Sequence, residues 1–184
     1  RRAPSDAARE ALRELEAPEL SKGGGDDAKF EVLSRRMEVR DGMGDLPGAL
    51  AASERYVTAA AGQPPSWNLA IRIREHAWLL HRMGRSDEAW AAFARAASVA
   101  RPVGHLLEED VLMKEGIARF QRQEWAEGTR CMDKCIPAFR RAGQKKLLAQ
   151  SLRYRAGASE RMGRYGEASR DAKEAWELAS AMES

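Results

Sequence analysis

The chain has 184 residues, which suits one ordinary domain or a short array of repeats. Its 31 Lys and Arg residues nearly balance 28 Asp and Glu residues, and a net charge of +3 is too small and too interspersed for a nucleic-acid-binding surface. The mean hydropathy is −0.58, and no apolar run approaches the ~20 residues of a membrane span. Two cysteines cannot form a disulfide framework, so we expect an intracellular, cytoplasmic protein. Because the chain opens on Arg1 without an initiating Met, we also expect a fragment of a longer protein.

Residues 1–28 are expected to form a segment separate from the rest of the chain. Within them, residues 5–16 have a helical pattern with Ser5 as the N-cap, and Pro18 ends the helix. The glycine run at 23–25 is typical of a flexible linker. We expect this N-terminal segment to be loosely attached to the remainder of the protein.

A short string recurs along the rest of the chain at a nearly constant spacing. Met-Gly dipeptides end at Gly44, Gly84 and Gly163, and Gln123 holds the equivalent place in a less perfect copy. Successive positions are 40, 39 and 40 residues apart. Glycine tolerates the left-handed backbone that ends a helix. Each copy is therefore predicted to be two antiparallel helices joined at this turn.

Columns of equivalent residues support helices on both sides of each turn. A large aliphatic residue recurs in the first helix, at Leu33, Ile73, Leu112 and Leu152. Small residues recur in the second helix, at Ala49, Ala89, Gly128 and Ala168. The expected helices are 29–43, 46–61, 67–83, 86–100, 106–122, 125–141, 145–162 and 165–182. The sequence thus predicts an all-α fold, an α-solenoid domain over 29–184 with repeats at about 29–62, 66–103, 105–143 and 145–182.

The second copy resembles the tetratricopeptide repeat (TPR) family in the spacing of Ala77, Gly84, Ala89, Phe93 and Ala96. A period near 40 departs from the usual ~34 residues and is similar to the longer-helix variant in kinesin light chains and cell-polarity scaffolds. HEAT-like helix pairs share this period and are the structural alternative.

The resemblance implies a concave groove lined by the first helix of each pair. Carried onto this sequence, the peptide-binding residues are Arg74, Trp78, His81, Arg82, Met113, Ile117, Phe120, Arg153 and Arg161. An apolar floor flanked by arginines fits an acidic peptide with apolar anchors. The alternative is that Trp78 and Phe120 pack between helices and that the arginines are ordinary solvated charges.

Catalytic and metal-binding patterns are not found in the sequence. Cys131 and Cys135 are spaced as two metal ligands could be, but a structural zinc site needs four ligands and no His lies near them in sequence. We interpret them as buried structural thiols. His76 and His81 are five residues apart and point to different faces of a helix. We expect no metal, no cofactor and no enzymatic activity.

The leading functional hypothesis is a non-enzymatic protein–protein interaction module that binds a peptide or helix of a partner, with neither nucleic acid nor membrane as a partner. One alternative is a structural segment of a large assembly, such as a ciliary or axonemal docking scaffold, since residues 107–180 loosely resemble the TPR subunits of dynein docking. A regulatory peptide-sensing domain of a signalling protein is another. Apolar residues near the end of the last helix are expected to be covered by a further repeat or subunit: Trp176, Leu178 and Met182.

Overall fold

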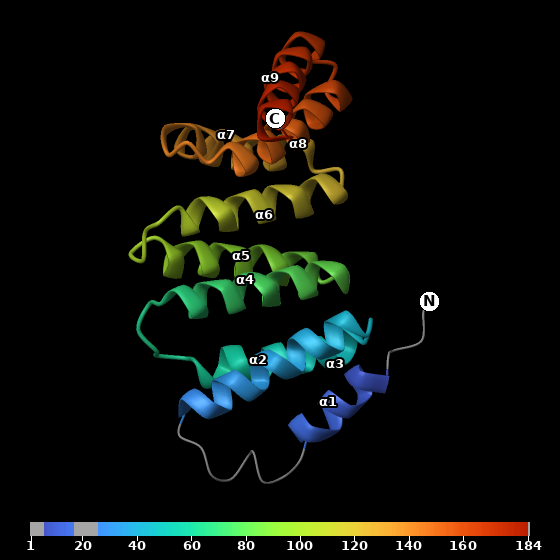
Figure 1. Cartoon of the computed structure of the whole chain (residues 1–184), viewed down its shortest axis with the longest axis vertical. Helices are drawn as coiled ribbons and strands as arrows, with labels where there is room; N and C mark the ends of the chain where they lie inside the picture. Colours follow the sequence, from blue (N-terminus) through green and yellow to red (C-terminus); the bar gives the residue numbers. More distant parts are fainter. Residues whose placement is uncertain (1–5, 17–25, 184) are drawn as a thin grey trace. The chain divides into compact units, whose positions relative to one another are not determined.

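The computed structural model describes residues 6–16 and 26–183, in which all regular secondary structure is α-helical. The predicted N-cap Ser5 and the predicted glycine linker lie outside the described residues. The helices, shown in Figure 1, are α1 (Asp6–Glu16), α2 (Asp26–Gly42), α3 (Leu46–Ala59), α4 (Trp67–Arg82), α5 (Ser86–Ala100), α6 (Leu107–Gln121), α7 (Trp125–Arg141), α8 (Lys145–Arg161) and α9 (Tyr165–Glu183). The all-α repeat prediction is confirmed. The largest difference is that α2 begins at Asp26 rather than at residue 29.

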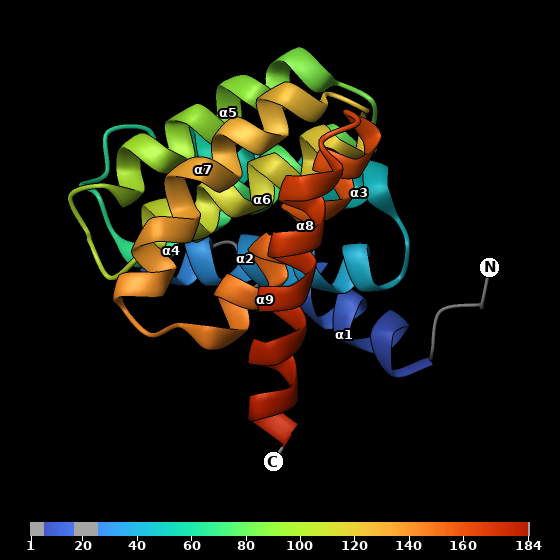
Figure 2. The same cartoon turned by 90° about the horizontal axis from the view of Figure 1, so that it is seen from above.

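The chain forms two compact units, Arg1–Ala92 and Phe93–Ser184. The first unit holds α1 to α4 and the start of α5, and the second holds the rest of α5 and α6 to α9. Within each unit, helices that are consecutive in the chain pack together, as α2 does with α3 and α8 with α9. Figure 2 gives a second view of the same helices. The division expected between residues 28 and 29 stays a prediction.

The turns inside the helix pairs share one geometry. The aligned positions all have a left-handed backbone, with φ of 77° at Gly44, 78° at Gly84, 62° at Gln123 and 75° at Gly163. The next residue then donates its N–H to a carbonyl five positions earlier, as Arg85 does to Leu80 at 3.0 Å and Arg164 to Ser159 at 2.8 Å. These bonds satisfy carbonyls that would otherwise be orphaned at the helix end. Gln123 therefore occupies a glycine-type turn position, which explains why the third copy still keeps the period.

The N-terminal helix packs against the first repeat. Helix α1 contacts α2, and the Arg36 guanidinium of α2 donates to the carbonyl oxygen of Leu15, with an Nε–O distance of 3.0 Å. A cation suits the last turn of a helix, where carbonyl groups lack intrahelical partners. The expectation that this segment is loosely attached is therefore wrong for α1.

The core of the first unit lies among α2, α3, α4 and the start of α5. Ala49 and Ala89, from the predicted column of small side chains, are buried in it. The buried members of this cluster are Met37, Ala49, Leu50, Ala52, Leu79, Leu80 and Ala89. At its edge Arg72 of α4 pairs with Glu38 of α2, with an N–O distance of 2.8 Å. Helix α4 is therefore fixed to α2 by apolar packing and by charge.

In the second unit, α6 and α7 cross at two closely packed glycines, Gly116 and Gly128. A Cβ built on Gly128 would lie 2.4 Å from the Phe120 ring and 3.0 Å from the Gly116 carbonyl oxygen. A Cβ on Gly116 would lie 3.1 Å from the Gly128 carbonyl oxygen. Real Cβ atoms do not approach a ring as closely as 2.4 Å, so position 128 requires glycine, while position 116 leaves little room for a methyl group.

The close contact between α6 and α7 predicts opposite changes in stability for two glycine substitutions. Gly128→Ala should lower the free energy of unfolding by about 1–3 kcal/mol, because the new methyl group overpacks the Phe120 ring. Gly157→Ala, at a site in α8 with nothing within 4 Å of the new Cβ, should raise it by about 0.5–1 kcal/mol through helix propensity. Urea unfolding followed by circular dichroism measures both. Stabilisation by both substitutions would show that the crossing of α6 and α7 can accommodate a methyl group.

Candidate partner-binding surface

The second unit has a groove between α8 and α9, with a volume of about 650 Å³. Its floor consists mainly of alanine, including Ala156, Ala172 and Ala175. Lys146, Arg153 and Trp176 also line it. The groove thus combines an apolar bottom with two cations and one aromatic side chain.

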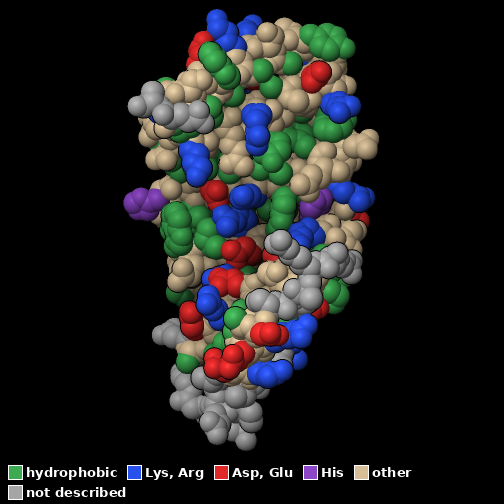
Figure 3. Space-filling model, turned by 45° about the vertical axis from the view of Figure 1, so that its right-hand side comes forward, with side chains coloured by type: hydrophobic (Ala, Val, Ile, Leu, Met, Phe, Trp, Pro, Cys, Tyr) green, Lys and Arg blue, Asp and Glu red, His purple; other side chains and the backbone are tan. Residues whose placement is uncertain are grey.

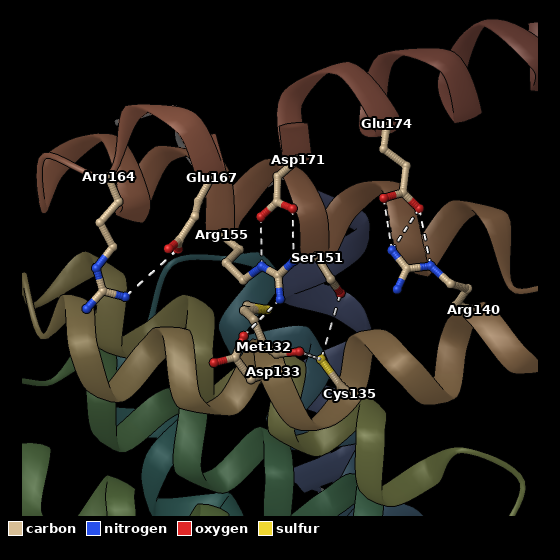
Figure 4. A network of polar contacts seen from close by, with 10 residues as sticks. All are labelled: Met132, Asp133, Cys135, Arg140, Ser151, Arg155, Arg164, Glu167, Asp171 and Glu174. Atoms are coloured by element: carbon tan, nitrogen blue, oxygen red, sulfur yellow. Dashed lines mark hydrogen bonds and ion pairs between the residues drawn. The ribbon is translucent and has the colours of Figure 1, made fainter. Parts of the chain in front are cut away.

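Arg155 of α8 fixes α9 in place. Its guanidinium donates to both carboxylate oxygens of Asp171 on α9, at 2.7 and 2.8 Å, and its third nitrogen donates to Asp133 of α7 at 2.8 Å (Figure 4). The hydrogen bonds to Asp171 are the main reason why the pKa of Arg155 is raised. Bidentate pairing fixes both distance and orientation. One side chain therefore joins three helices.

A second guanidinium reinforces this arrangement further along α9. Arg140 of α7 lies against Glu174 of α9, with N–O distances of 2.8 and 2.9 Å (Figure 4). Asp171 and Glu174 therefore point toward α7 and α8. Residues 172, 175, 176 and 179 have the helical spacing of a different face, and this face lines the groove.

Trp176 is a large and exposed apolar residue of the groove. Its side chain is 70% exposed, although the indole is one of the largest apolar groups in the chain. Ala172 and Ala179 lie one turn before and after it, too small to cover it. The lining thus presents a bare aromatic surface.

The nine residues expected to bind a peptide divide between the two units. In the first unit, Arg74 and Trp78 are half-buried, and His81 is buried with its ring 5.5 Å from that of Trp78. Arg82 pairs with Asp41 of α2. This end of α4 therefore offers Trp78 as a partly accessible aromatic residue, while Arg82 already has a carboxylate partner.

In the second unit, three of the nine residues are buried, namely Met113, Ile117 and Phe120. The Phe120 ring stacks on Trp125 at 6.3 Å and occupies the space beside Gly128, so it contributes to helix packing. Arg153 and Arg161 are exposed, and Arg153 lines the α8–α9 groove. The binding role of the nine residues stays a prediction.

The two cysteines are buried in α7. Burial raises the pKa of the Cys131 thiol to about 12 and that of Cys135 to about 11. Cys135 lies 3.9 Å from the Ser151 hydroxyl of α8, a contact inside the packing of the unit (Figure 4). Among the described residues, no group of three His, Cys, Asp or Glu side chains is placed to hold a metal ion.

Several groove residues escaped the sequence prediction because they lie outside the first helices of the pairs. Ala172 and Ala179 stand 40 positions after Met132 and Phe139. Equivalent positions in the third and fourth copies therefore differ by two large apolar side chains, and this difference indicates the groove. The resemblance places the peptide-binding residues on the first helices only, whereas Trp176 on the last helix is expected to be covered by a further repeat or subunit.

Outside the groove, basic and acidic side chains are interspersed on the surface. On the face seen in Figure 3, Lys and Arg side chains are interspersed with hydrophobic and acidic ones. No helix in residues 6–16 or 26–183 is long and apolar enough to cross a membrane.

No family model and no curated protein matches this chain. Among solved structures, BtubC (BKLC) from P. vanneervenii matches with a TM-score of 0.80 and 16% identity, over 96% of this chain and 72% of that one. MamA MSR-1 matches with a TM-score of 0.63 and 19% identity, over 96% and 89% of the two chains. MamA AMB-1 matches with a TM-score of 0.61 and 18% identity, over 95% and 84%. These neighbours are TPR-like helical repeat proteins. The chain has a TPR-like fold.

The arrangement of α9 in the TPR-like fold predicts unequal effects for two arginines. Arg155→Gln should lower the free energy of unfolding by about 2 kcal/mol, because it leaves the carboxylate of Asp171, only 8% exposed, without its partner. Arg164→Gln, which removes a cation 3.9 Å from Glu167 in an exposed pair, should change it by less than about 0.5 kcal/mol. Urea unfolding measures both variants. Equal effects would show that Arg155 does not hold α9.

The buried thiols of the TPR-like fold should resist modification. At about pH 8 both stay protonated in the folded chain, so Ellman's reagent should react only as the chain unfolds. Because each folded pKa lies above the unfolded value, the native state should lose stability as pH rises from about 9 toward the folded pKa values. The chain unfolded in urea, in which both thiols should react quickly, is the control. Fast reaction of a thiol in the folded chain would contradict the burial.

Proposed function

We propose that this chain is a non-enzymatic protein–protein interaction module whose α8–α9 groove binds a peptide or helix of a partner protein. The observation that carries the proposal is Trp176, 70% exposed above an alanine floor and beside Arg153. Tryptophan and arginine are the residue types that contribute most often to binding hot spots. Covering the indole would remove a large apolar surface from water, which favours association.

The chemistry of the groove suits binding rather than catalysis. Its lining consists of alanine, one tryptophan, one glutamine and the cations Lys146 and Arg153. Such a set holds apolar and acidic side chains, whereas catalysis of proton transfer needs a positioned acid or base. Arg153 is common to the groove lining and to the residues predicted from the repeat pattern. In the first unit, Arg74, Trp78 and Arg82 are candidate contacts of a separate site.

A structural segment of a larger assembly is the second candidate function. Met182, six residues beyond the tryptophan on α9, is 46% exposed, and Leu178 is half-buried. These apolar side chains extend the uncovered surface of α9 beyond the groove. A neighbour in an assembly would cover Met182 as well as Trp176, whereas a peptide confined to the groove would cover only Trp176.

Two exposed aromatic residues allow a matched test. Trp176→Ala should reduce the capture of partner proteins from a lysate by roughly tenfold or more, because hot-spot truncation costs about 2 kcal/mol or more. Tyr165→Ala removes an aromatic side chain that is also 70% exposed and should leave capture unchanged. Quantitative mass spectrometry of the bound fraction measures the effect, after circular dichroism has shown that both variants are folded.

Equal capture by the wild type and Trp176→Ala would contradict binding at the groove. Met182→Ala separates the two candidate functions. Partner loss with Trp176→Ala alone supports a groove-bound peptide or helix, and partner loss with both variants supports the structural segment.

A further inference from the structure

The groove has an internal counterpart that is already covered by a helix. Forty positions earlier in the chain, the same surface is formed by α6 and α7, and α8 packs against both of them. On that surface Met132, Cys135 and Phe139 are fully buried, and Cys135 contacts Ser151 of α8. A helix is therefore the kind of element that this surface accepts in the TPR-like fold.

The α8–α9 groove differs from its counterpart in size. Ala172 and Ala179 stand where the covered surface has Met132 and Phe139. The smaller side chains deepen the open hollow between α8 and α9, which has a volume of about 650 Å³. An occupant must supply that volume with large apolar side chains, because unfilled space forfeits dispersion contacts. Helical spacing i, i+3 and i+4 would place such side chains together.

The groove also differs in charge. Three positions that are Leu106, Met113 and Asp133 around the covered surface are Lys146, Arg153 and Lys173 in the fourth copy. Two apolar groups and one carboxylate have thus been replaced by three cations. On the covered surface the carboxylate of Asp133 receives Arg155 of the docked helix, with an N–O distance of 2.8 Å. A cation at that place on an incoming helix would instead meet Lys173.

Acidic groups near the groove do not cancel this change. Glu174 is held by Arg140 in a bidentate pair that faces away from the groove. Glu177 lies 3.9 Å from Lys173, with side-chain exposures of 56% and 77%, and so exposed a pair contributes little attraction. The sequence of α8 carries Lys145, Lys146, Arg153 and Arg155 and only Glu160 as an acid, so a helix like α8 would be repelled.

We infer that the α8–α9 groove binds an amphipathic helix of a partner protein, with large apolar side chains on one face and carboxylates beside them. The inference rests on the proposed function and names the chemistry of its partner. The apolar side chains fill the space above Ala172 and Ala179 and cover Trp176. The carboxylates pair with Lys146, Arg153 and Lys173.

Two peptides derived from this chain test the inference. Both span residues 145–161 and carry Ser151→Leu, which gives Leu at 148, 151 and 152. The acidic probe also carries Lys145→Glu, Lys146→Glu, Arg153→Glu and Arg155→Glu, and the basic probe keeps these residues. Short helices are marginal in water, so circular dichroism must first match the helicity of the two peptides.

Fluorescence anisotropy of the labelled peptides with the full chain measures their affinities. The acidic probe should bind about tenfold more tightly than the basic probe, because its net charge is opposite to that of the cations around the groove. The variant Lys146→Glu, Arg153→Glu, Lys173→Glu should reverse this preference. The control variant Arg130→Glu, Lys134→Glu, Arg141→Glu makes the same charge change at exposed positions of α7 and should keep the preference.

The outcomes separate the inference from the proposed function. Four results would each overturn the inference that an acidic helix binds the groove. They are equal affinities, tighter binding of the basic probe, binding of neither probe, and an unchanged preference in the groove variant. Capture of partners that still depends on Trp176 would leave the proposed function in place. Sedimentation at rising concentration tests a second copy as the occupant, and a dimer dissociated by Trp176→Ala would also overturn the inference.

Discussion

The arrangement of the last three helices depends on Arg155, which is held by two carboxylates from different helices. Its bidentate pair with Asp171 sets the rotation of α9 about its own axis, and its bond to Asp133 ties the same side chain to α7. Fixing the rotation decides which residues of α9 face outward. Ala172, Ala175 and Trp176 line the groove because Asp171 and Glu174 are held on the other side.

Repeat proteins reuse one packing surface, and this chain shows the surface in two states. Over α6 and α7 it is filled with Met, Ile and Phe and covered by α8. Over α8 and α9 its counterpart is hollow and is lined mainly by alanine, with the cations Lys146 and Arg153 beside it. The turn between the two helices has the same left-handed geometry in both copies, at Gln123 and at Gly163. Side-chain volume and charge differ, and they change a packing surface into a binding surface.

The sequence determined the helices because their signals are local. A constant period, an apolar column and a left-handed turn are properties of a few neighbouring residues, and Gln123 has a left-handed φ of 62° even without glycine. Arg153 was also found by this reasoning, since it lies on the first helix of its pair. The same pattern could not distinguish lining from core at Met113 or Phe120. Both are buried, and Phe120 fills the space that Gly128 leaves beside it.

What only the tertiary structure decided is which helix faces are covered. Periodicity identifies the residues that share a face, but burial depends on which element from elsewhere in the chain packs against that face. Helix α8 covers the face of α6 and α7 that carries Met132 and Phe139, while within the described residues nothing covers the equivalent face with Trp176. The sequence by itself thus determined a TPR-like array of helices and a set of arginines, and it indicated that Trp176 needs a covering partner. The three-dimensional contacts decided that its open apolar surface lies between α8 and α9, because burial is set by contacts between helices rather than by the residues of any one of them.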